Sequence, residues 1–234
     1  MNSKGRLIGV GVGPGDPKLL TVAAVEALST APVIAYLAAE GRDCLARLVA
    51  ARYFNEDAVE HSYFAPMHGS EAELLEFYRQ TAQEISVDLA AGRDVAFLCL
   101  GDPLFYGSFS YLLPHLQTSF AIETIPGITS FNASMAKLGL PLVLQQDHFA
   151  ILPASGFTPN LLQDPALKGL VLMKLGARLA NIRKQVNDLG LAGSTWIASR
   201  IGWPDERLTR LNDWGDTPPP YMSLMIIANT QSQR

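Results

Sequence analysis

Over the first 138 residues, short apolar runs alternate with amphipathic stretches, and this alternation restricts the possible folds more than any other feature of the chain. The apolar runs have the length of strands, and the segments between them repeat apolar residues at helical spacing. The predicted strands cover residues 6–12, 33–36, 94–100 and 121–125, and the predicted helices cover 18–28, 42–53, 70–91, 107–116 and 128–138. Residues 61–67 are compatible with either structure. This order predicts a largely parallel sheet with helices on both faces.

After Gly139-Leu140-Pro141 the pattern changes to strands joined by Pro- and Gly-rich turns, with one clear helix over residues 178–189. The strands predicted here cover residues 148–152, 170–175, 195–199 and 222–228. Three prolines make residues 213–220 an extended loop. We therefore predict an α/β protein with two α/β lobes. A mostly parallel sheet domain over 1–127 precedes a smaller mixed α+β domain over 128–234, with the ligand cleft between them.

A glycine- and proline-rich run, residues 9–17, follows the first predicted strand and limits the kind of ligand expected there. A phosphate cradle needs consecutive backbone N–H groups, and Pro14 and Pro17 remove two of them. The third glycine of a dinucleotide-binding Gly-x-Gly-x-x-Gly motif would fall on Pro14 or Asp16, and no Gly-Lys-Ser/Thr follows. The run therefore predicts a rigid turn of small residues rather than a phosphate site.

Two further turns end the third and fourth predicted strands. Residues 100–107, Leu-Gly-Asp-Pro-Leu-Phe-Tyr-Gly, place Asp102 and Tyr106 on one of them, and residues 125–130, Ile-Pro-Gly-Ile-Thr-Ser, form the other. Because ligands of open parallel sheets bind outside the carboxyl ends of the strands, all three turns are expected to meet at one crevice. The alternative is that Asp102 and Thr129 only cap the helices that follow.

Composition narrows the class of protein. The 234 residues are 48% hydrophobic and 17% charged, which is sufficient for a buried core. The formal net charge is −4, with basic residues scattered among acidic ones, so nucleic acid is not an expected partner. Cys44 and Cys99 are too few for a disulfide framework and fit a reducing cytoplasm. We find no membrane span and no export signal, and predict a cytoplasmic protein.

The three turns together resemble the tetrapyrrole methylases, the class III S-adenosylmethionine-dependent methyltransferases of cobalamin and sirohaem synthesis. The resemblance covers nearly the whole chain and is carried by Gly-x-Gly-Pro-Gly-Asp-Pro at residues 11–17, by Gly-Asp-Pro at 101–103 and by Pro-Gly-Ile-Thr-Ser at 126–130. Within the family, residues 101–109 resemble the branch that methylates C20 of precorrin-2 or of its cobalt-containing counterpart.

The resemblance implies a site for S-adenosylmethionine (SAM), with S-adenosylhomocysteine (SAH) as the product. The residues it implies as cofactor contacts are Pro14, Leu100, Gly101, Asp102, Phe105, Thr129, Ser130, Met173 and Ile201. A sulfonium donor carries a positive charge and an amino-acid tail but no phosphate, so a loop interrupted by prolines is compatible with it. The resemblance also implies a homodimer.

The implied reaction is in-line methyl transfer from sulfur to a carbon at the rim of the macrocycle. Because a reduced tetrapyrrole is already nucleophilic at this carbon, the main task of the protein is to align the reactants and exclude water. Asp102 and Tyr106 are the catalytic candidates that could accept the C20 proton, although macrocycle nitrogens could do so instead.

The tetrapyrrole substrate carries many carboxylates, so cationic side chains are expected near it. The candidates are Arg42, Arg47, Arg52, His61, His68 and Lys137, and the competing interpretation is a solvated surface. No set of His, Cys, Asp and Glu has the spacing of a metal site, so no protein-bound metal is predicted.

Other functions remain open at this point. The chain could methylate another tetrapyrrole position, or could bind SAM or tetrapyrrole without catalysis. A family member acting on ribosomal RNA or on a protein residue is a further alternative, which the net charge and the Tyr106 turn disfavour for RNA. A methyltransferase of the common Rossmann class is the last, although Leu7 occupies the place of its acidic residue.

Overall fold

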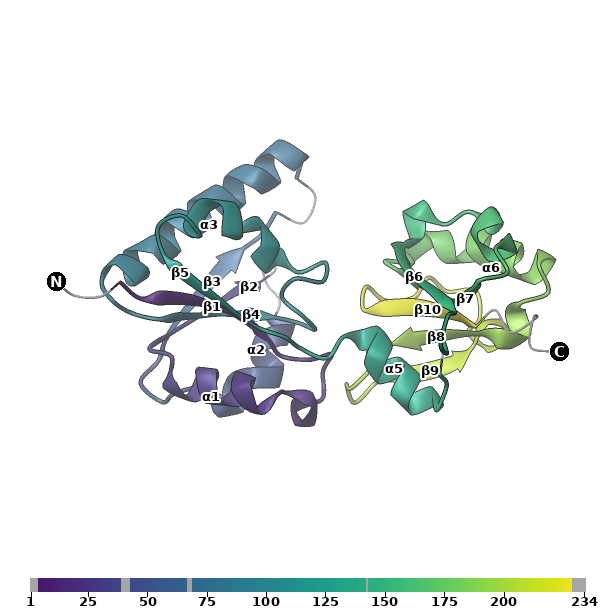
Figure 1. Cartoon of the computed structure of the whole chain (residues 1–234), viewed down its shortest axis with the longest axis horizontal. Coiled ribbons are helices and arrows are strands. Elements are labelled where there is room, and N and C mark those ends of the chain that lie inside the picture. Colours follow the sequence, from purple (N-terminus) through teal and green to yellow (C-terminus); the bar gives the residue numbers. More distant parts are fainter. Residues whose placement is uncertain (1–3, 39–42, 67–68, 142, 229–234) are drawn as a thin grey trace. The chain divides into compact units, whose positions relative to one another are not determined.

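Two five-stranded sheets organise the part of the chain that the structure describes, residues 4–38, 43–66, 69–141 and 143–228 (Figure 1). The structure is a computed structural model. It divides the chain into two units, Met1–Thr129 and Ser130–Arg234, each with its own sheet and its own apolar core.

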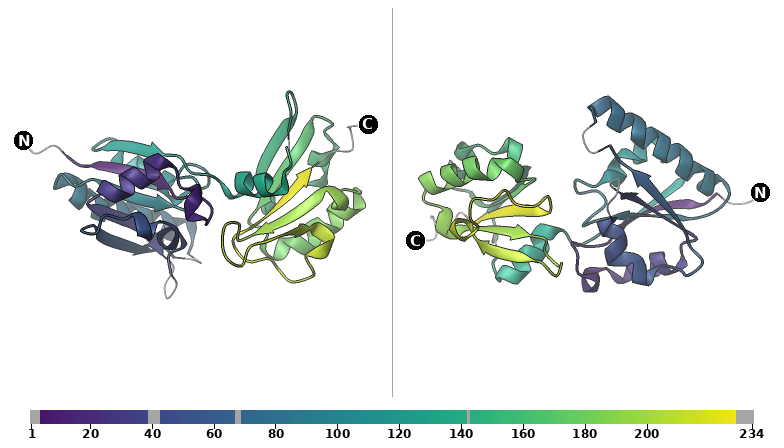
Figure 2. Two further views of the ribbon diagram at one scale, coloured as in Figure 1. Left: turned by 90° about the horizontal axis from the view of Figure 1, so that it is seen from below. Right: turned by 180° about the vertical axis from the view of Figure 1, so that it is seen from behind.

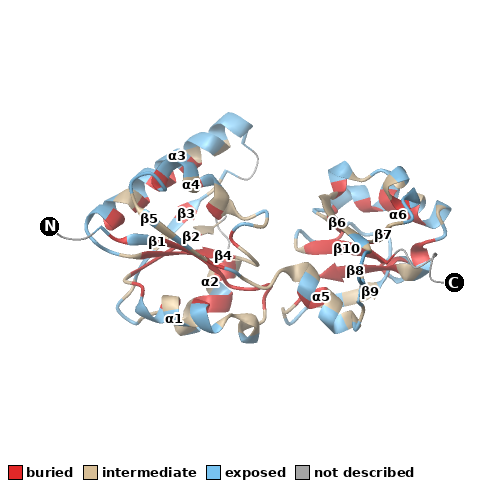
Figure 3. Cartoon of the chain, viewed as in Figure 1, coloured by how far each residue is buried: buried red, intermediate tan, exposed pale blue. Residues whose placement is uncertain are grey.

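The sheet of the first unit is parallel throughout and has the strand order β3-β2-β4-β1-β5. Its strands are β1 (Arg6–Gly11), β2 (Val33–Ala38), β3 (Val59–Phe64), β4 (Val95–Cys99) and β5 (Ala121–Ile125). All five residues of β4 are buried, as are the last five of β1, because helices cover both faces of the sheet (Figure 3). The segment with two possible structures, residues 61–67, contributes to β3, an edge strand.

Helices α1 (Val22–Thr30) and α2 (Leu45–Ala50) lie on one face of this sheet, and α3 (Glu71–Ala90) and α4 (Leu113–Leu116) lie on the other (Figures 1 and 2). Ser70 begins α3 with a capping box, because its side chain accepts from the Glu73 N–H while the Glu73 carboxylate accepts from the Ser70 N–H. The capping box explains why the predicted start of this helix was close to the observed one.

Three helix predictions were wrong in extent. In place of one helix over 18–28, a 3₁₀ turn (Pro17–Leu19) precedes α1, which begins after its N-cap residue Thr21. In place of one helix over 107–116, a 3₁₀ turn (Ser108–Tyr111) is followed by the single turn of α4, whose second position is Pro114. The segment 42–53 contains only α2 and a 3₁₀ turn (Ala51–Tyr53). Proline residues and N-caps break these segments into shorter helices and 3₁₀ turns, which apolar spacing alone does not reveal.

The second unit has a mixed sheet with the order β6-β7-β10-β8-β9. Its strands are β6 (His148–Pro153), β7 (Leu167–Met173), β8 (Thr195–Ser199), β9 (Arg207–Arg210) and β10 (Ser223–Ala228). Strands β6 and β7 are parallel, while β10 runs antiparallel to both β7 and β8. Helix α6 (Leu179–Asp188) covers one face and α5 (Ser130–Leu138) the other (Figures 1 and 2). The predicted class, two α/β lobes with a mostly parallel and then a mixed sheet, is confirmed.

Strand β9 was not predicted, because Arg-Leu-Thr-Arg is short and carries charge at both ends. It forms the edge of the second sheet by pairing with β8. The guanidinium of Arg210 lies 4.1 Å from the centroid of the Trp196 ring, so the tryptophan is covered by its neighbour on the edge strand. Tertiary pairing supplies the stability that this four-residue segment lacks by itself.

Candidate functional site

The carboxyl ends of β1, β4 and β5 are neighbours in the first sheet, and a turn leaves each of them. The first two turns are joined by backbone hydrogen bonds. The Gly101 N–H donates to the Gly13 carbonyl oxygen (N···O 2.8 Å), and the Gly13 N–H donates in return to Gly101 (3.4 Å). The structure therefore brings the first two predicted turns together, as the sequence indicated.

The third turn packs directly against the other two, and only glycines permit this approach. A Cβ atom at Gly127 would lie 2.0 Å from the Gly101 carbonyl oxygen and 2.8 Å from the Gly11 Cα. A Cβ at Gly11 would lie 2.5 Å from the Gly127 nitrogen. Since real Cβ contacts are longer than these distances, the three backbones pack closely because these positions carry no side chain.

Asp102 connects two of the turns through its carboxylate. One oxygen, Oδ1, accepts from the Leu104 N–H within its own turn (2.9 Å), and the other, Oδ2, accepts from the Gly127 N–H of the third turn (3.0 Å). The first contact is an Asx turn, and the second joins residues 25 apart in sequence. Asp102 therefore does more than cap the segment that follows it, which was the alternative left open by the sequence.

The remaining predicted residues of these turns differ in exposure. Pro14 is buried, while Leu100, Phe105 and Thr129 are half-buried. Tyr106 is 51% exposed, and its backbone has φ of 53°, a left-handed conformation that is costly for a non-glycine residue. Its ring meets that of Phe105 edge to face, with centroids 4.9 Å apart.

Gly101, unlike Gly11 and Gly127, is a glycine of the turns at which the structure leaves space. Its φ is +74°, and a Cβ built on it would have no heavy atom within 4 Å. The backbone at Gly101 consequently borders an opening, while its carbonyl oxygen is packed against Gly127. The space beside the Gly101 Cα is therefore open to a ligand.

Asp16, the acidic residue of the first turn, has a local role. Its Oδ1 accepts from the Lys18 N–H (2.9 Å) and so begins the 3₁₀ turn ahead of α1. The first turn therefore ends in a capped segment rather than in a row of free N–H donors, consistent with the prediction that it is not a phosphate cradle.

In the second unit, Met173 ends β7 and Ile201 follows β8 by two residues. Both strands flank the start of β10, where Met173 is opposite Leu224 and Ser199 is opposite Ser223. Lys174, directly after β7, and Arg200, directly after β8, have φ of 57° and 48°, so a left-handed residue follows each strand. Met173 and Ile201 thus lie at the same end of the second sheet, where β7 and β8 finish and β10 begins.

The model of the tetrapyrrole (corrin/porphyrin) methylase family matches residues 6–212, which is most of the chain. The chain belongs to the tetrapyrrole methylases. The signature turns on which the predicted resemblance rested are therefore the turns of a family member, and the suspected family is confirmed.

Individual relatives are similar over almost their full length. A Sinorhizobium protein named precorrin-2 C(20)-methyltransferase is 38% identical over 232 residues, 95% of each chain. The Salmonella typhimurium cobalt-precorrin-2 C(20)-methyltransferase is 29% identical over 95% of this chain and 96% of that one. The crystal structure of a Thermus thermophilus uroporphyrin-III C-methyltransferase complexed with S-adenosylhomocysteine is 29% identical, with a TM-score of 0.63 and coverage of 96% and 97%.

Three of the six cations predicted to bind substrate carboxylates lie beside acidic side chains within this methylase. Arg47 donates twice to Glu60, through Nε to Oε2 (2.5 Å) and through Nη2 to Oε1 (2.8 Å), and this guanidinium lowers the pKa of Glu60 below its ordinary value. Lys137 pairs with Glu206 (2.8 Å), and His61 Nε2 lies 3.4 Å from Asp88 Oδ2. Their role as substrate ligands remains a prediction that competes with these pairs.

Of the other three cationic candidates, Arg52 lies with its guanidinium 5.9 Å from the centroid of the Tyr53 ring. Arg42 and His68 are outside the described residues. The structure therefore gives no carboxylate-binding geometry for Arg42, Arg52 or His68.

The sequence analysis did not identify Glu206, whose carboxylate bonds to the backbone of the turn that contains Ile201. One Glu206 oxygen accepts from the Gly202 N–H (2.7 Å) and the other pairs with Lys137 of α5. Arg200 pairs with Asp205 in the same turn (2.6 Å). A basic residue at 200 followed by acidic residues at 205 and 206 was the available signal, but charges near a turn are usually solvated.

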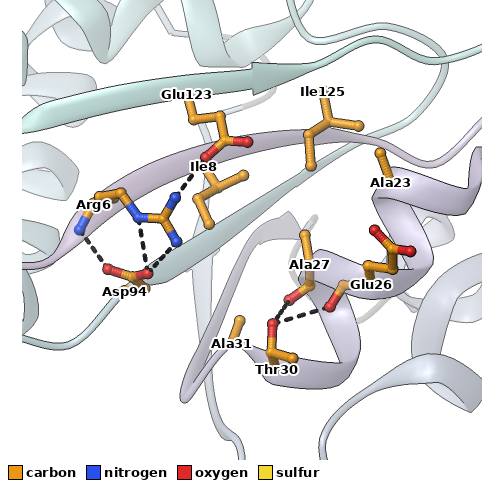
Figure 4. Close-up of a pocket in the computed structure, with 10 residues that line it drawn as sticks. All are labelled: Arg6, Ile8, Ala23, Glu26, Ala27, Thr30, Ala31, Asp94, Glu123 and Ile125. Carbon is orange, nitrogen blue, oxygen red and sulfur yellow. Dashed lines mark hydrogen bonds and ion pairs between the residues drawn. The ribbon is translucent and has the colours of Figure 1, made fainter.

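A pocket of about 270 Å³ lies between α1 and the first sheet, and its lining runs from Arg6 at the start of β1 to Ile125 at the end of β5 (Figure 4). Its polar wall is Arg6, at the start of β1, paired with Asp94 (2.8 Å) and Glu123 (2.8 Å). Thr30, on α1, donates to the Glu26 carbonyl oxygen (2.9 Å). Arg6 thus links β1 to Asp94 and Glu123, and the Thr30 bond lies within α1, so these polar groups already have partners and the pocket is not taken as a second candidate site.

The described residues contain neither a metal centre nor a membrane-spanning helix. No three His, Cys, Asp or Glu side chains come together there in a way that could hold a metal ion. No helix in the same part of the chain is long and apolar enough to cross a membrane.

Proposed function

We propose that this tetrapyrrole methylase transfers a methyl group from SAM to C20 of precorrin-2 or of cobalt-precorrin-2, in cobalamin biosynthesis. The observation that carries the proposal is the convergence of the three signature turns, joined by the Gly13–Gly101 bridge and by the Asp102–Gly127 hydrogen bond. The C20 position is supported by the relative that is 38% identical over 95% of both chains and is named for it.

The turns suit a donor without phosphate. Gly101 borders open space with its main chain, whereas Pro14 and Pro17 offer no N–H. SAM, when bound, supplies an electrophilic methyl group on a positively charged sulfur. We propose that Pro14, Leu100, Gly101, Asp102, Phe105, Thr129 and Ser130 hold it, with Met173 and Ile201 from the second unit. A Thermus relative of known structure has SAH bound, which supports the same cofactor here.

The residues of the turns would act mainly by orientation. A close-packed group of backbones fixes where a donor can lie, and apolar side chains such as Phe105 help to exclude water. Of the two candidates for accepting the C20 proton, Tyr106 and Asp102, we propose Tyr106. Of these, the half-exposed Tyr106 can reach a ligand, whereas both oxygens of Asp102 already accept backbone N–H groups.

Further parts of the proposal concern the whole protein. We propose that residues 1–127 form the tetrapyrrole-binding side and that residues 128–234 complete the SAM site. We also propose a cytoplasmic homodimer. Both cysteines are buried thiols, which suits a reducing compartment. Sedimentation at micromolar concentration tests the dimer, and a monomer under these conditions would remove that part of the proposal.

The decisive experiment incubates the protein with methyl-labelled SAM and either metal-free or cobalt-loaded precorrin-2. We expect one methyl group per macrocycle at C20, located by carbon NMR, with stoichiometric SAH. Methylation at another position, or of uroporphyrinogen III in parallel tubes, would identify a different member of the family. Tight SAH binding without turnover on any tetrapyrrole would indicate a non-catalytic binding protein.

A further inference from the structure

The third turn lacks the strand pairing that fixes the first two turns in place. The pairing of β5 with β1 ends at Ile125 opposite Val10, and Gly127 lies two residues beyond it. Its N–H donates to Asp102 Oδ2 (3.0 Å), a side chain from a different turn. This bond is the polar contact that the structure gives for holding the backbone of Gly127 at the site.

Both oxygens of the Asp102 carboxylate accept a backbone N–H in this arrangement. Oδ1 holds the Leu104 N–H and Oδ2 holds the Gly127 N–H, so each oxygen serves one turn. An ionised carboxylate has only acceptors, and it can serve two N–H donors at once. A proton taken up by either oxygen would weaken the bond to the N–H already there. The geometry is therefore that of a clamp between two backbones rather than of a group that accepts protons.

We infer that Asp102 is a positioning residue that holds the Gly127 turn against Gly101, so that the donor-binding backbone is in place before SAM arrives. This inference rests on the proposed function, since it assigns a role within the same site. Its physical basis is preorganisation: groups fixed in the free protein lose less freedom when the ligand binds. Gly127 and Gly101 are in close contact, because a Cβ at Gly127 would overlap the Gly101 carbonyl oxygen.

Asp102→Asn is the informative variant because it keeps the size of the side chain. Asparagine has one carbonyl oxygen, and its amide nitrogen would face an N–H donor, so only one of the two bonds survives. The matched control is Asp164→Asn. Asp164 makes the same local contact to the N–H two residues on, Ala166 (2.8 Å), but lies outside the three turns.

The first measurement follows hydrogen exchange at the Gly127 and Leu104 amides without any ligand. In the wild-type protein both amides should be protected, and in Asp102→Asn at least one should exchange at least tenfold faster. An unprotected Gly127 amide in the wild type would overturn the inference without any variant, so the test stands even if Asp102→Asn folds poorly.

The second measurement compares SAH binding by calorimetry with the rate of methyl transfer from saturating SAM to precorrin-2 across pH. Asp102→Asn should weaken SAH binding about tenfold, because the turn must be ordered on binding. It should leave the pH profile unchanged, and Asp164→Asn should bind like the wild type.

Two other outcomes are separable. A proton-accepting Asp102 would give normal SAH binding in Asp102→Asn but a loss of roughly 10²- to 10⁴-fold in rate, with an altered pH profile, and would overturn the inference alone. A wild-type protein that binds no SAH would instead overturn the proposed function and the inference with it.

Discussion

Two glycines of the candidate site differ in their surroundings, and the difference determines what a side chain would do there. Gly127 is enclosed by the backbones of Gly11 and Gly101, so any side chain must displace a neighbouring turn. Gly101 has the opposite environment: a positive φ and open space where a Cβ would project. At the residue scale, the first position therefore maintains the packing of the turns, and the second borders the space proposed for the donor.

We predict that Gly101→Ala weakens SAH binding, because its methyl group enters that space. Gly139→Ala is the control, since Gly139 also has a positive φ and no heavy atom within 4 Å of the place where a Cβ would lie, but it is outside the three turns. Both variants should lose about 1 kcal/mol of unfolding free energy through the left-handed conformation. Calorimetry should show weaker SAH binding for Gly101→Ala alone, and equal affinities in the two variants would contradict the assignment.

The thiol of Cys99, at the end of β4, gives a pH-dependent prediction. Burial raises its pKa from 9.0 to about 12. Because the folded pKa is above the unfolded one, Cys99 contributes stability that is present below pH 9 and is lost as the pH rises toward 12.

Urea unfolding at pH 8 and pH 10 should therefore show a greater loss of unfolding free energy for the wild type than for Cys99→Ala. Between these two pH values the extra loss in the wild type should be about 1.4 kcal/mol, because the unfolded thiol releases its proton around pH 9 while the folded thiol stays protonated. Cys44, whose pKa burial also raises, is present in both proteins and cancels in the comparison. Parallel pH dependences would show that Cys99 ionises equally in the folded and unfolded states.

At the scale of single elements, helix α1 illustrates how local chemistry sets a boundary. Apolar spacing predicted a helix from residue 18, but the helix starts only after Thr21, whose Oγ1 accepts from the Ala24 N–H (3.1 Å). The residues before it form the 3₁₀ turn begun by Asp16. The N-cap therefore separates the first signature turn from the helix that follows.

Replacing this cap should destabilise the protein measurably. We predict that Thr21→Ala lowers the unfolding free energy by about 1 kcal/mol, because the Ala24 N–H loses its partner. Thr21→Ser keeps a hydroxyl oxygen and should stay close to the wild type. Urea denaturation of the three proteins is the check, and a Thr21→Ala midpoint equal to that of Thr21→Ser would show that the cap contributes little.

At the scale of the whole molecule, each unit places proposed donor contacts at the carboxyl ends of its strands. The first unit brings together three turns at the carboxyl ends of β1, β4 and β5, and the second places Met173 and Ile201 beside the start of β10. The proposed donor contacts come from both groups, so binding should depend on residues far apart in the sequence.

The sharpest test of the second unit is Met173→Ala. We expect it to weaken SAH binding about tenfold through loss of apolar contact, which is roughly 1.4 kcal/mol. Met135→Ala removes a similarly half-buried methionine from α5 and should bind like the wild type. Each affinity can also be read from thermal unfolding, because SAH at a hundred times its dissociation constant adds about 2.7 kcal/mol. Unchanged binding in Met173→Ala would remove that residue from the proposed site.

The sequence by itself determined the fold class, most strand positions and the three signature turns, because these depend on local apolar spacing and on the fixed preferences of glycine and proline. It also indicated that the turns would meet, since parallel strands bring their carboxyl ends to one edge.

Only the tertiary structure decided which backbone atoms meet there. The Gly13–Gly101 bridge, the Asp102–Gly127 bond and the pairing of Lys137 with Glu206 join residues 88, 25 and 69 positions apart. Strand β9 likewise exists because β8 pairs with it. Such contacts depend on the folded path of the chain, and local sequence carries no record of a partner so distant.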